Sequence, residues 1–234
     1  MFSELKDKIK KVRPSIIAIG FRPEPNTEPN KVTIIGSGFA VSDDGKILSS
    51  AHLYRQLKPE YVLSLIGMAM TEQGSNDLER YKWFPLKFIK KEDDDDVALF
   101  QIEEYKNTLL KKLDLESSED VEVGDEVYFI GFPYAAELIN EGFGITLVVN
   151  KGIISNIKRD GTDPSRKRNW FIIDAISNPG NSGCPLINLK TNKVIGIMAI
   201  TWRKRSKTHQ DLDIREPMHI CAAKPINLAK DLLK

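Results

Sequence analysis

Short apolar runs separated by turn residues recur along most of this chain and limit the folds that it can adopt. Examples lie at residues 15–21, 32–41, 97–103 and 126–132, with glycine, proline, asparagine or charged residues between such runs. Runs of this length, rich in β-branched and aromatic residues and bounded by turn signals, are typical of β-strands. The pattern therefore predicts a protein made mostly of short strands.

Helical periodicity is confined to the two ends of the chain. The apolar residues at helical spacing are Leu5, Ile9 and Val12 near the start and Leu228, Leu232 and Leu233 near the finish. Many strands with few helices favour a β-sandwich or a β-barrel. We expect an all-β fold with short N-terminal and C-terminal helices.

Composition limits the cellular setting rather than the fold. The 234 residues have a net charge of +1, so the overall charge does not indicate binding to nucleic acid or to a membrane. No apolar run approaches the roughly 18 residues of a membrane helix. The chain has two cysteines, Cys184 and Cys221, and its start lacks the apolar segment of a signal peptide. These features predict reduced thiols, no membrane span and a cytoplasmic location.

The stretch SNPGNSGCPL, residues 177–186, places one serine, Ser182, between two glycines and between two apolar runs. A strand, a tight turn and a second strand can be a simple hairpin. The alternative is a loop that presents a nucleophile. A serine becomes a useful nucleophile only when a base takes its proton and a third group orients that base.

A histidine and an aspartate stand at suitable places for those two roles. The chain has three histidines, His52, His209 and His219, of which only His52 ends a strand-like run, KILSSAHLY. Asp96 begins the run DVALF, whose apolar continuation is expected to hold its carboxylate in place. The chain order His52, Asp96, Ser182 is the order of the chymotrypsin fold.

Three segments resemble trypsin-like serine proteases of the HtrA (Deg) type. GSGFAVSDDGKILSSAHLY resembles the segment around the family's histidine, DVALFQIE its aspartate strand and DAISNPGNSGCPLIN its serine loop. Further similar segments cover nearly the whole chain in register. The resemblance implies two six-stranded antiparallel β-barrels. It divides the chain into an N-terminal helix and entry segment, 1–15, a first barrel, 16–115, with His52 and Asp96, and a second barrel, 116–234, with Ser182 and a closing helix.

The resemblance also implies a role for each residue of the site. His52 would act as general base and then acid, Asp96 would orient it, and Ser182 would form the acyl-enzyme. The backbone N–H groups of Gly180, Asn181 and Ser182 would form the oxyanion hole, where glycine permits dihedrals that a side chain resists. No cofactor is expected.

The acidic run EDDDD at residues 92–96 has a metal-binding alternative. Hard cations bind carboxylates, but such ligand loops usually space their carboxylates and include a turn glycine. We therefore interpret Asp93, Asp94 and Asp95 as a solvated loop and expect no metal site.

The sequence departs from the family pattern in several places. Cys184 stands where the family has a second glycine after the serine, so a side chain must fit there. We expect no peptide-binding (PDZ) domain after the closing helix and no regulation through one. The segments 158–168 and 202–217 are richer in charge than the glycine-rich loops of the family.

Arg203, Lys204 and Arg205 belong to the second of those charged segments. They are interpreted either as parts of a solvated loop or as a cationic rim that attracts an acidic substrate or partner. Aromatic residues for base stacking are sparse, with only Trp170 and Trp202 nearby, so nucleic acid ranks last among the partners.

The pocket for the residue before the scissile bond is assigned by family register to Ile176 and to Met198, Ala199, Ile200 and Thr201. None of these is acidic, so a buried lysine or arginine would find no partner, and small or medium aliphatic residues are expected instead.

The leading hypothesis is an intracellular serine endopeptidase acting on protein or peptide substrates. One alternative is a binding or scaffold module that keeps the fold without turnover. A second alternative is a latent protease that awaits a partner. The sequence is compatible with a homo-oligomer and does not specify one.

Overall fold

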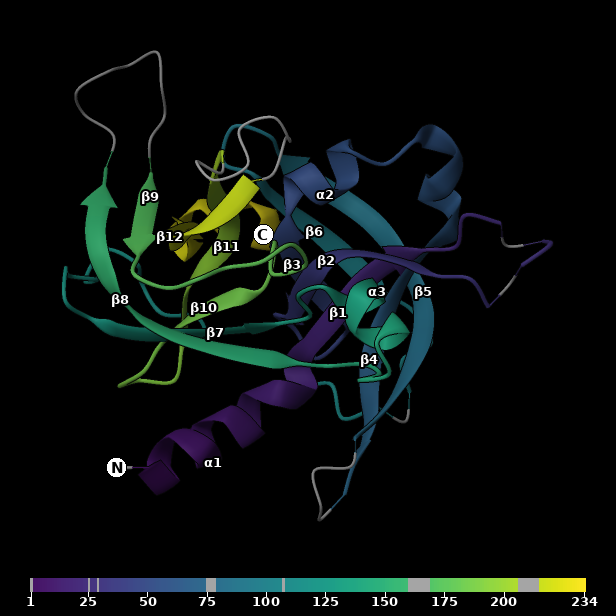
Figure 1. Ribbon diagram of the computed structural model, residues 1–234, viewed down its shortest axis with the longest axis horizontal. Helices are drawn as coiled ribbons and strands as arrows, with labels where there is room; N and C mark the ends of the chain where they lie inside the picture. The colour runs from purple at the N-terminus through teal and green to yellow at the C-terminus, as the bar shows by residue number, and fades with distance from the viewer. Residues whose placement is uncertain are drawn as a thin grey trace.

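Strands dominate the computed structural model of the chain (Figure 1). It describes residues 2–24, 26–28, 30–74, 79–106, 108–159, 169–205 and 215–234, with the backbone alone for residues 2–3, 204–205 and 215–217. Within these ranges twelve strands form two closed antiparallel barrels of six strands each. The expected all-β fold of two six-stranded barrels is confirmed.

The first barrel contains the strands of the N-terminal half in the order β1-β2-β3-β6-β5-β4. Their bounds are β1 Ile16–Phe21, β2 Thr33–Ala40, β3 Lys46–Ser50, β4 Leu65–Gln73, β5 Glu79–Glu92 and β6 Val97–Ile102. Register shifts within the β1–β2, β4–β5 and β5–β6 pairs mark bulges. Bulges bend strands, and a short closed barrel requires such bends.

The second barrel has the order β10-β11-β12-β9-β8-β7. Its strands are β7 Glu126–Gly131, β8 Val148–Lys158, β9 Trp170–Ile173, β10 Pro185–Asn188, β11 Val194–Arg205 and β12 Arg215–Pro225. Leu115 forms an isolated parallel bridge with Val194 of this barrel. The division of the chain at residue 115 itself stays a prediction.

The helical segments are short. They are α1 Phe2–Val12, η1 Arg13–Ser15, α2 Ala51–Arg55, η2 Pro59–Ser64, α3 Ala135–Asn140 and η3 Ile226–Leu233, of which the η segments are 3₁₀ helices. The apolar run YVLSLIG, residues 61–67, also fits the strand pattern of the sequence and predicts a strand, but its first part belongs to η2, which begins at Pro59. Proline suits the first turn of a helix because it has no N–H to pair. No helix in the described ranges is long and apolar enough to cross a membrane.

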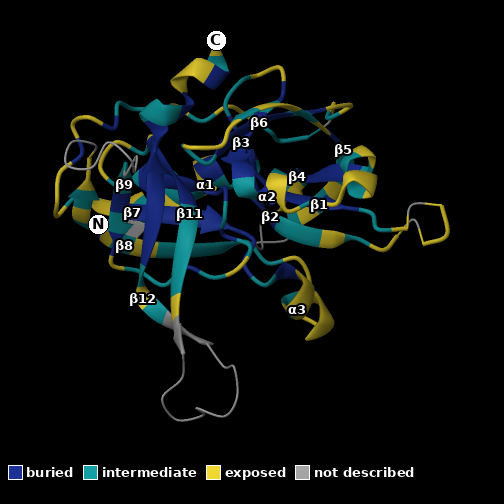
Figure 2. Ribbon diagram, turned by 90° about the horizontal axis from the view of Figure 1, so that it is seen from above, coloured by how far each residue is buried: buried dark blue, intermediate teal, exposed yellow. Residues whose placement is uncertain are grey.

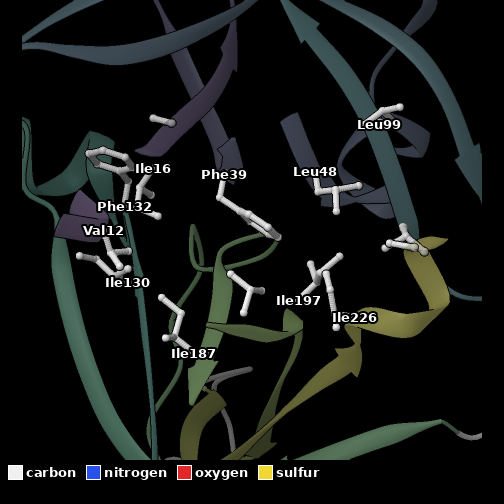
Figure 3. Packing of buried hydrophobic residues seen from close by; sticks show 14 of the residues in the cluster. Val12, Ile16, Phe39, Leu48, Leu99, Ile130, Phe132, Ile187, Ile197 and Ile226 are labelled. Carbon is white, nitrogen blue, oxygen red and sulfur yellow. The ribbon is translucent and has the colours of Figure 1, made fainter. Parts of the chain in front are cut away.

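Three clusters of buried apolar side chains form the core. Ile47 and Phe100 belong to the cluster inside the first barrel, and Phe129 and Phe171 to the cluster inside the second. The third cluster combines side chains from both barrels, and Phe39 and Leu48 of the first lie opposite Ile197 and Ile226 of the second (Figure 3). Strands such as β3 and β6 are mostly buried, whereas most of α3 is exposed (Figure 2). The two barrels therefore share a packed interface.

Candidate active site

His52 and Asp96 lie side by side because two neighbouring strands lead to them. β3 pairs with β6, and Ser50 is opposite Val97, so the residue that follows β3 and the residue that precedes β6 are close together. The Asp96 Oδ2 accepts a hydrogen bond from His52 Nδ1 at 2.7 Å, and the Asp96 Oδ1 accepts one from the His52 backbone N–H at 2.8 Å. Two acceptors on one carboxylate thus fix both the backbone and the ring of His52.

Asp96 has an unusual backbone conformation. Its φ is +53°, in the left-handed region, where aspartate is tolerated better than most side chains. The turn that precedes β6 produces this angle, and the Asp96 carbonyl then accepts the Ala51 N–H at 3.1 Å. The turn before β6 thus directs the Asp96 carboxylate toward α2. The first backbone N–H of α2 in return donates to the Asp96 carbonyl.

Arg55 is a member of this cluster that the sequence analysis missed. Its guanidinium donates to Asp96 Oδ1 at 3.1 Å and to Asp93 Oδ1 at 3.2 Å. The side-chain contact with Lys91, followed by the contact with Arg55, lowers the pKa of Asp93. Arg55 lies three residues after His52 on α2, a spacing that places two side chains on one face of a helix. In the sequence, this spacing of an arginine from the histidine is the signal that points to Arg55.

Backbone hydrogen bonds hold the loop that carries Ser182. The Ser182 carbonyl accepts the Ser37 N–H of β2 at 2.8 Å, and the Gly183 N–H donates to the Met198 carbonyl of β11 at 2.7 Å. Gly183 has φ +85°, and a Cβ on it would overlap the Ser49 hydroxyl and the Ser37 carbonyl. Glycine is therefore the residue that allows the loop to pass this close to the first barrel.

The three backbone N–H groups assigned to the oxyanion hole are not equivalent. Asn181 donates its N–H to the Asn178 carbonyl at 3.0 Å, which closes a turn. Within the described part of the chain, the N–H groups of Gly180 and Ser182 have no acceptor. Tyr134 donates its N–H to the Pro179 carbonyl at 2.8 Å and so fixes the peptide plane that carries the Gly180 N–H.

The His52 ring and the Ser182 hydroxyl have unused hydrogen-bonding capacity, and His52 borders a cavity. Neither the second ring nitrogen of His52 nor the Ser182 hydroxyl has a hydrogen-bond partner among the described residues. A cavity of about 520 Å³ adjoins His52, and its lining includes Trp170, Lys224 and the Ala199–Thr201 segment. Lys224 is 2% exposed, with its ammonium 4.0 Å from the centre of the Trp170 ring. The same cavity is also lined by Asp93, Asp94 and Asp96 of the acidic run.

The residues assigned to the substrate pocket lie in different surroundings. Ala199, Ile200 and Thr201 line the cavity beside His52. Met198 is 1% exposed and packs in the core of the second barrel, while Ile176 is half-buried in the loop before Ser182. β11 thus has Met198 in the interior of the second barrel and the next three residues at the cavity, with a register shift against β12 between Met198 and Ile200.

Cys184 fits in the serine loop because Gly131 lies opposite. Its side chain is fully buried, and a Cβ on Gly131 would be 3.0 Å from the Cys184 Cβ. Burial raises the pKa of the Cys184 thiol well above its ordinary value and that of Cys221 to about 12. Thiolate is the nucleophilic form of cysteine, so these neutral buried thiols behave as packing groups.

Of the three residues that the sequence places in the cationic rim, Arg203, Lys204 and Arg205, the structure describes the side chain of Arg203 alone. Its guanidinium donates to the Tyr134 hydroxyl at 2.8 Å, which links β11 to the start of α3. The side chains of Lys204 and Arg205 lie outside the described residues, as do residues 160–168 of the first charged segment and His209. His219 is exposed on β12.

Comparison with known proteins agrees with this architecture. A family model described as trypsin-like peptidase domain matches residues 36–197. Serine protease HTRA4 of Mus musculus is 32% identical over 193 residues, covering 81% of this chain and 35% of the relative. Serine protease HTRA1 of Xenopus tropicalis is 31% identical over 203 residues, covering 84% of this chain and 38% of the relative.

A bacterial relative shows the same pattern. The probable serine protease do-like of Buchnera aphidicola is 31% identical over 176 residues, with 75% of this chain and 31% of the relative covered. The chain spans about a third of the length of these relatives. Because the family model covers more than half of the chain, this protein belongs to the trypsin-like peptidase domain family, and within the matched region it is similar to serine proteases of the HtrA type.

Proposed function

We propose that the chain is a serine endopeptidase that acts through His52, Asp96 and Ser182. The observation that carries the proposal is the double contact of the Asp96 carboxylate with the ring and the backbone of His52. A carboxylate only accepts hydrogen bonds, so the His52 proton is on Nδ1. The other ring nitrogen, Nε2, is then free to take a proton.

In the proposed reaction, Nε2 of His52 takes the proton from the Ser182 hydroxyl as its oxygen attacks the scissile carbonyl. The new C–O bond gives a tetrahedral oxyanion, and the same proton passes from His52 to the leaving amine as the C–N bond breaks. Water then hydrolyses the acyl-enzyme by the same route. We assign the oxyanion to the N–H groups of Gly180 and Ser182, since the Asn181 N–H is already bound to Asn178.

We further propose that the enzyme prefers small or medium aliphatic residues before the scissile bond. The supporting observation is that the assigned residues Ile176, Ala199, Ile200 and Thr201 carry no negative charge. A peptide-library digest analysed by mass spectrometry tests this, with Ser182→Ala as control. Predominant cleavage after lysine or arginine, absent in the control, would refute the assignment of the pocket.

A latent protease is the second candidate function. Its supporting observation is that the Ser182 hydroxyl and the His52 ring are not hydrogen-bonded to each other in the described structure. Catalytic hydrogen bonds often tighten only when substrate is bound, so the same observation is compatible with an active resting enzyme. Basal cleavage of a peptide by the purified chain alone would exclude obligatory activation.

The setting and the partners are part of the proposal. Two free, buried cysteines, Cys184 and Cys221, support a cytoplasmic location, because reduced thiols are typical of that compartment. Cell fractionation tests this location.

The rim of Arg203, Lys204 and Arg205 is proposed to favour acidic substrates or partners. Light scattering of the purified chain tests a homo-oligomer.

A further inference from the structure

The hydroxyl of Ser37 lies at the junction of three segments of the proposed active site. Ser37 is on β2 of the first barrel and is fully buried. Its Oγ donates to the Gly180 carbonyl at 2.7 Å and accepts the Phe132 N–H at 3.0 Å. One side chain of the first barrel thus binds both the serine loop and the segment that leads from β7 to α3.

The backbone of Ser37 adds two more contacts in the same direction. Its N–H donates to the Ser182 carbonyl at 2.8 Å, and its carbonyl accepts the Ser49 hydroxyl at 2.7 Å. The carbonyls of Gly180 and Ser182 are therefore both held by this one residue of β2. Their peptide N–H groups belong to the next residues, but the dihedrals of Gly180 and Ser182 are fixed from the carbonyl side.

The oxyanion hole needs this kind of support. The N–H groups of Gly180 and Ser182 have no partner of their own among the described residues, so nothing bound to these nitrogens orients them. Gly180 has φ +99°, and glycine has wide conformational freedom. The peptide on one side of Gly180 is held by Tyr134 through Pro179, and the peptide on the other side by Ser37.

We infer that the Ser37 hydroxyl is a positioning residue for the oxyanion hole. This inference rests on the proposed serine endopeptidase function. Ser37 touches neither the substrate nor the reacting atoms, and acts by keeping the Gly180–Asn181 peptide in the orientation that directs the Gly180 and Ser182 N–H groups to one point. Preorganised donors stabilise the negative charge that develops on the oxyanion in the transition state. Loss of the Ser37 hydroxyl is therefore expected to lower kcat much more than it raises KM.

The test compares Ser37→Ala with Ser118→Ala. Ser118 is also buried, at 2% exposure, and accepts the Asn227 N–H at 3.3 Å away from the serine loop. We expect Ser37→Ala to lower kcat for a peptide ester about tenfold to hundredfold, with KM changed less than about threefold. Ser118→Ala should leave kcat near the wild-type value while thermal unfolding shows a comparable loss of stability.

Two further measurements separate positioning from a general loss of structure. A peptide boronate, which forms a tetrahedral adduct with serine, should bind Ser37→Ala more weakly by the same factor as kcat falls. Ser37→Cys retains a weak donor and acceptor, so its kcat should lie between wild type and alanine.

The outcomes distinguish this inference from the proposed function. A wild type that cleaves the ester, together with a Ser37→Ala kcat within about twofold of it, would overturn the role of Ser37 and leave the protease function intact. A fall in kcat without weaker boronate binding would also overturn it. A folded wild type that never cleaves the ester would overturn the active endopeptidase and with it the role of Ser37, and would leave the latent protease as the remaining candidate function.

Discussion

A carboxylate side chain holds the part of the site that the first barrel provides, whereas backbone hydrogen bonds, together with the hydroxyl of Ser37, hold the loop that the second barrel provides. His52 is fixed by two contacts from the Asp96 carboxylate, which Arg55 also binds. Ser182 is fixed by carbonyls and N–H groups of its own loop and its neighbours. The first half of the site, His52 with Asp96, therefore depends on residue identity. The second half of the site, the Ser182 loop, depends on peptide orientation at glycines.

The largest predicted effect joins the two halves. Ser182→Ala or His52→Ala should each lower kcat by about 10⁶-fold, and the double variant should be hardly worse, because the two act as a unit. Steady-state cleavage of a peptide ester measures this. Effects that multiply in the double variant would contradict a joint role.

The next prediction concerns the carboxylate of the first half. Asp96→Asn should lower kcat by about 10⁴-fold, because an amide can hold His52 in the wrong tautomer. Asp95→Asn is the matched control in the same acidic run and should stay near wild type. An inactive Asp95→Asn enzyme beside an active Asp96→Asn enzyme would show that the wrong aspartate has been assigned.

The second half should be sensitive to a single methyl group. A Cβ on Gly180 would overlap the Phe132 carbonyl, and φ +99° disfavours any side chain. Gly180→Ala should therefore lower kcat by about 10²-fold, the cost of losing an oxyanion donor. Gly142→Ala is a control, since Gly142 also has positive φ and open space around its Cβ position. Equal losses of kcat in both variants would contradict the orientation argument.

Substitution of Arg55 tests how much catalysis depends on the contact between Arg55 and the Asp96 carboxylate. Its side chain is 40% exposed, and exposed ion pairs contribute about 0.2–1 kcal/mol. Arg55→Gln should thus lower kcat by about fivefold at most, since about 1.4 kcal/mol corresponds to a factor of ten. A hundredfold loss in a variant with wild-type thermal stability would mean that Arg55 belongs to the catalytic machinery.

The smallest predicted effect lies at the cationic rim. Changing Arg203, Lys204 and Arg205 to glutamate should lower kcat/KM for an acidic peptide about threefold at low salt, with the difference fading as salt rises. A neutral peptide controls for the lost contact between Arg203 and Tyr134. Equal losses with both peptides would remove the electrostatic role.

The same contrast explains what the sequence could and could not predict. The alternating apolar runs predicted the strands and, with the resemblance, the two barrels. The small helices α2 and α3 were not predicted, because five or six residues carry no clear period. β10, only four residues long, was also missed.

Prediction of the site differed in the same way between its halves. Residue types pointed to His52 and Asp96, which the structure brings together. The roles of Ser37 and Tyr134 depend on which carbonyl each one faces, and this follows from loop conformation rather than from residue type. For the same reason, the sequence could not separate the bound Asn181 N–H from its two neighbours.

The proposed mechanism requires that Ser182 is a nucleophile activated by His52. Reaction of the purified chain with a fluorophosphonate probe, followed by peptide mapping, tests it most directly. We expect one label, on Ser182, that is lost in Ser182→Ala and strongly slowed in His52→Ala. A label on another residue, equal labelling of His52→Ala, or no labelling of the folded wild type would contradict it.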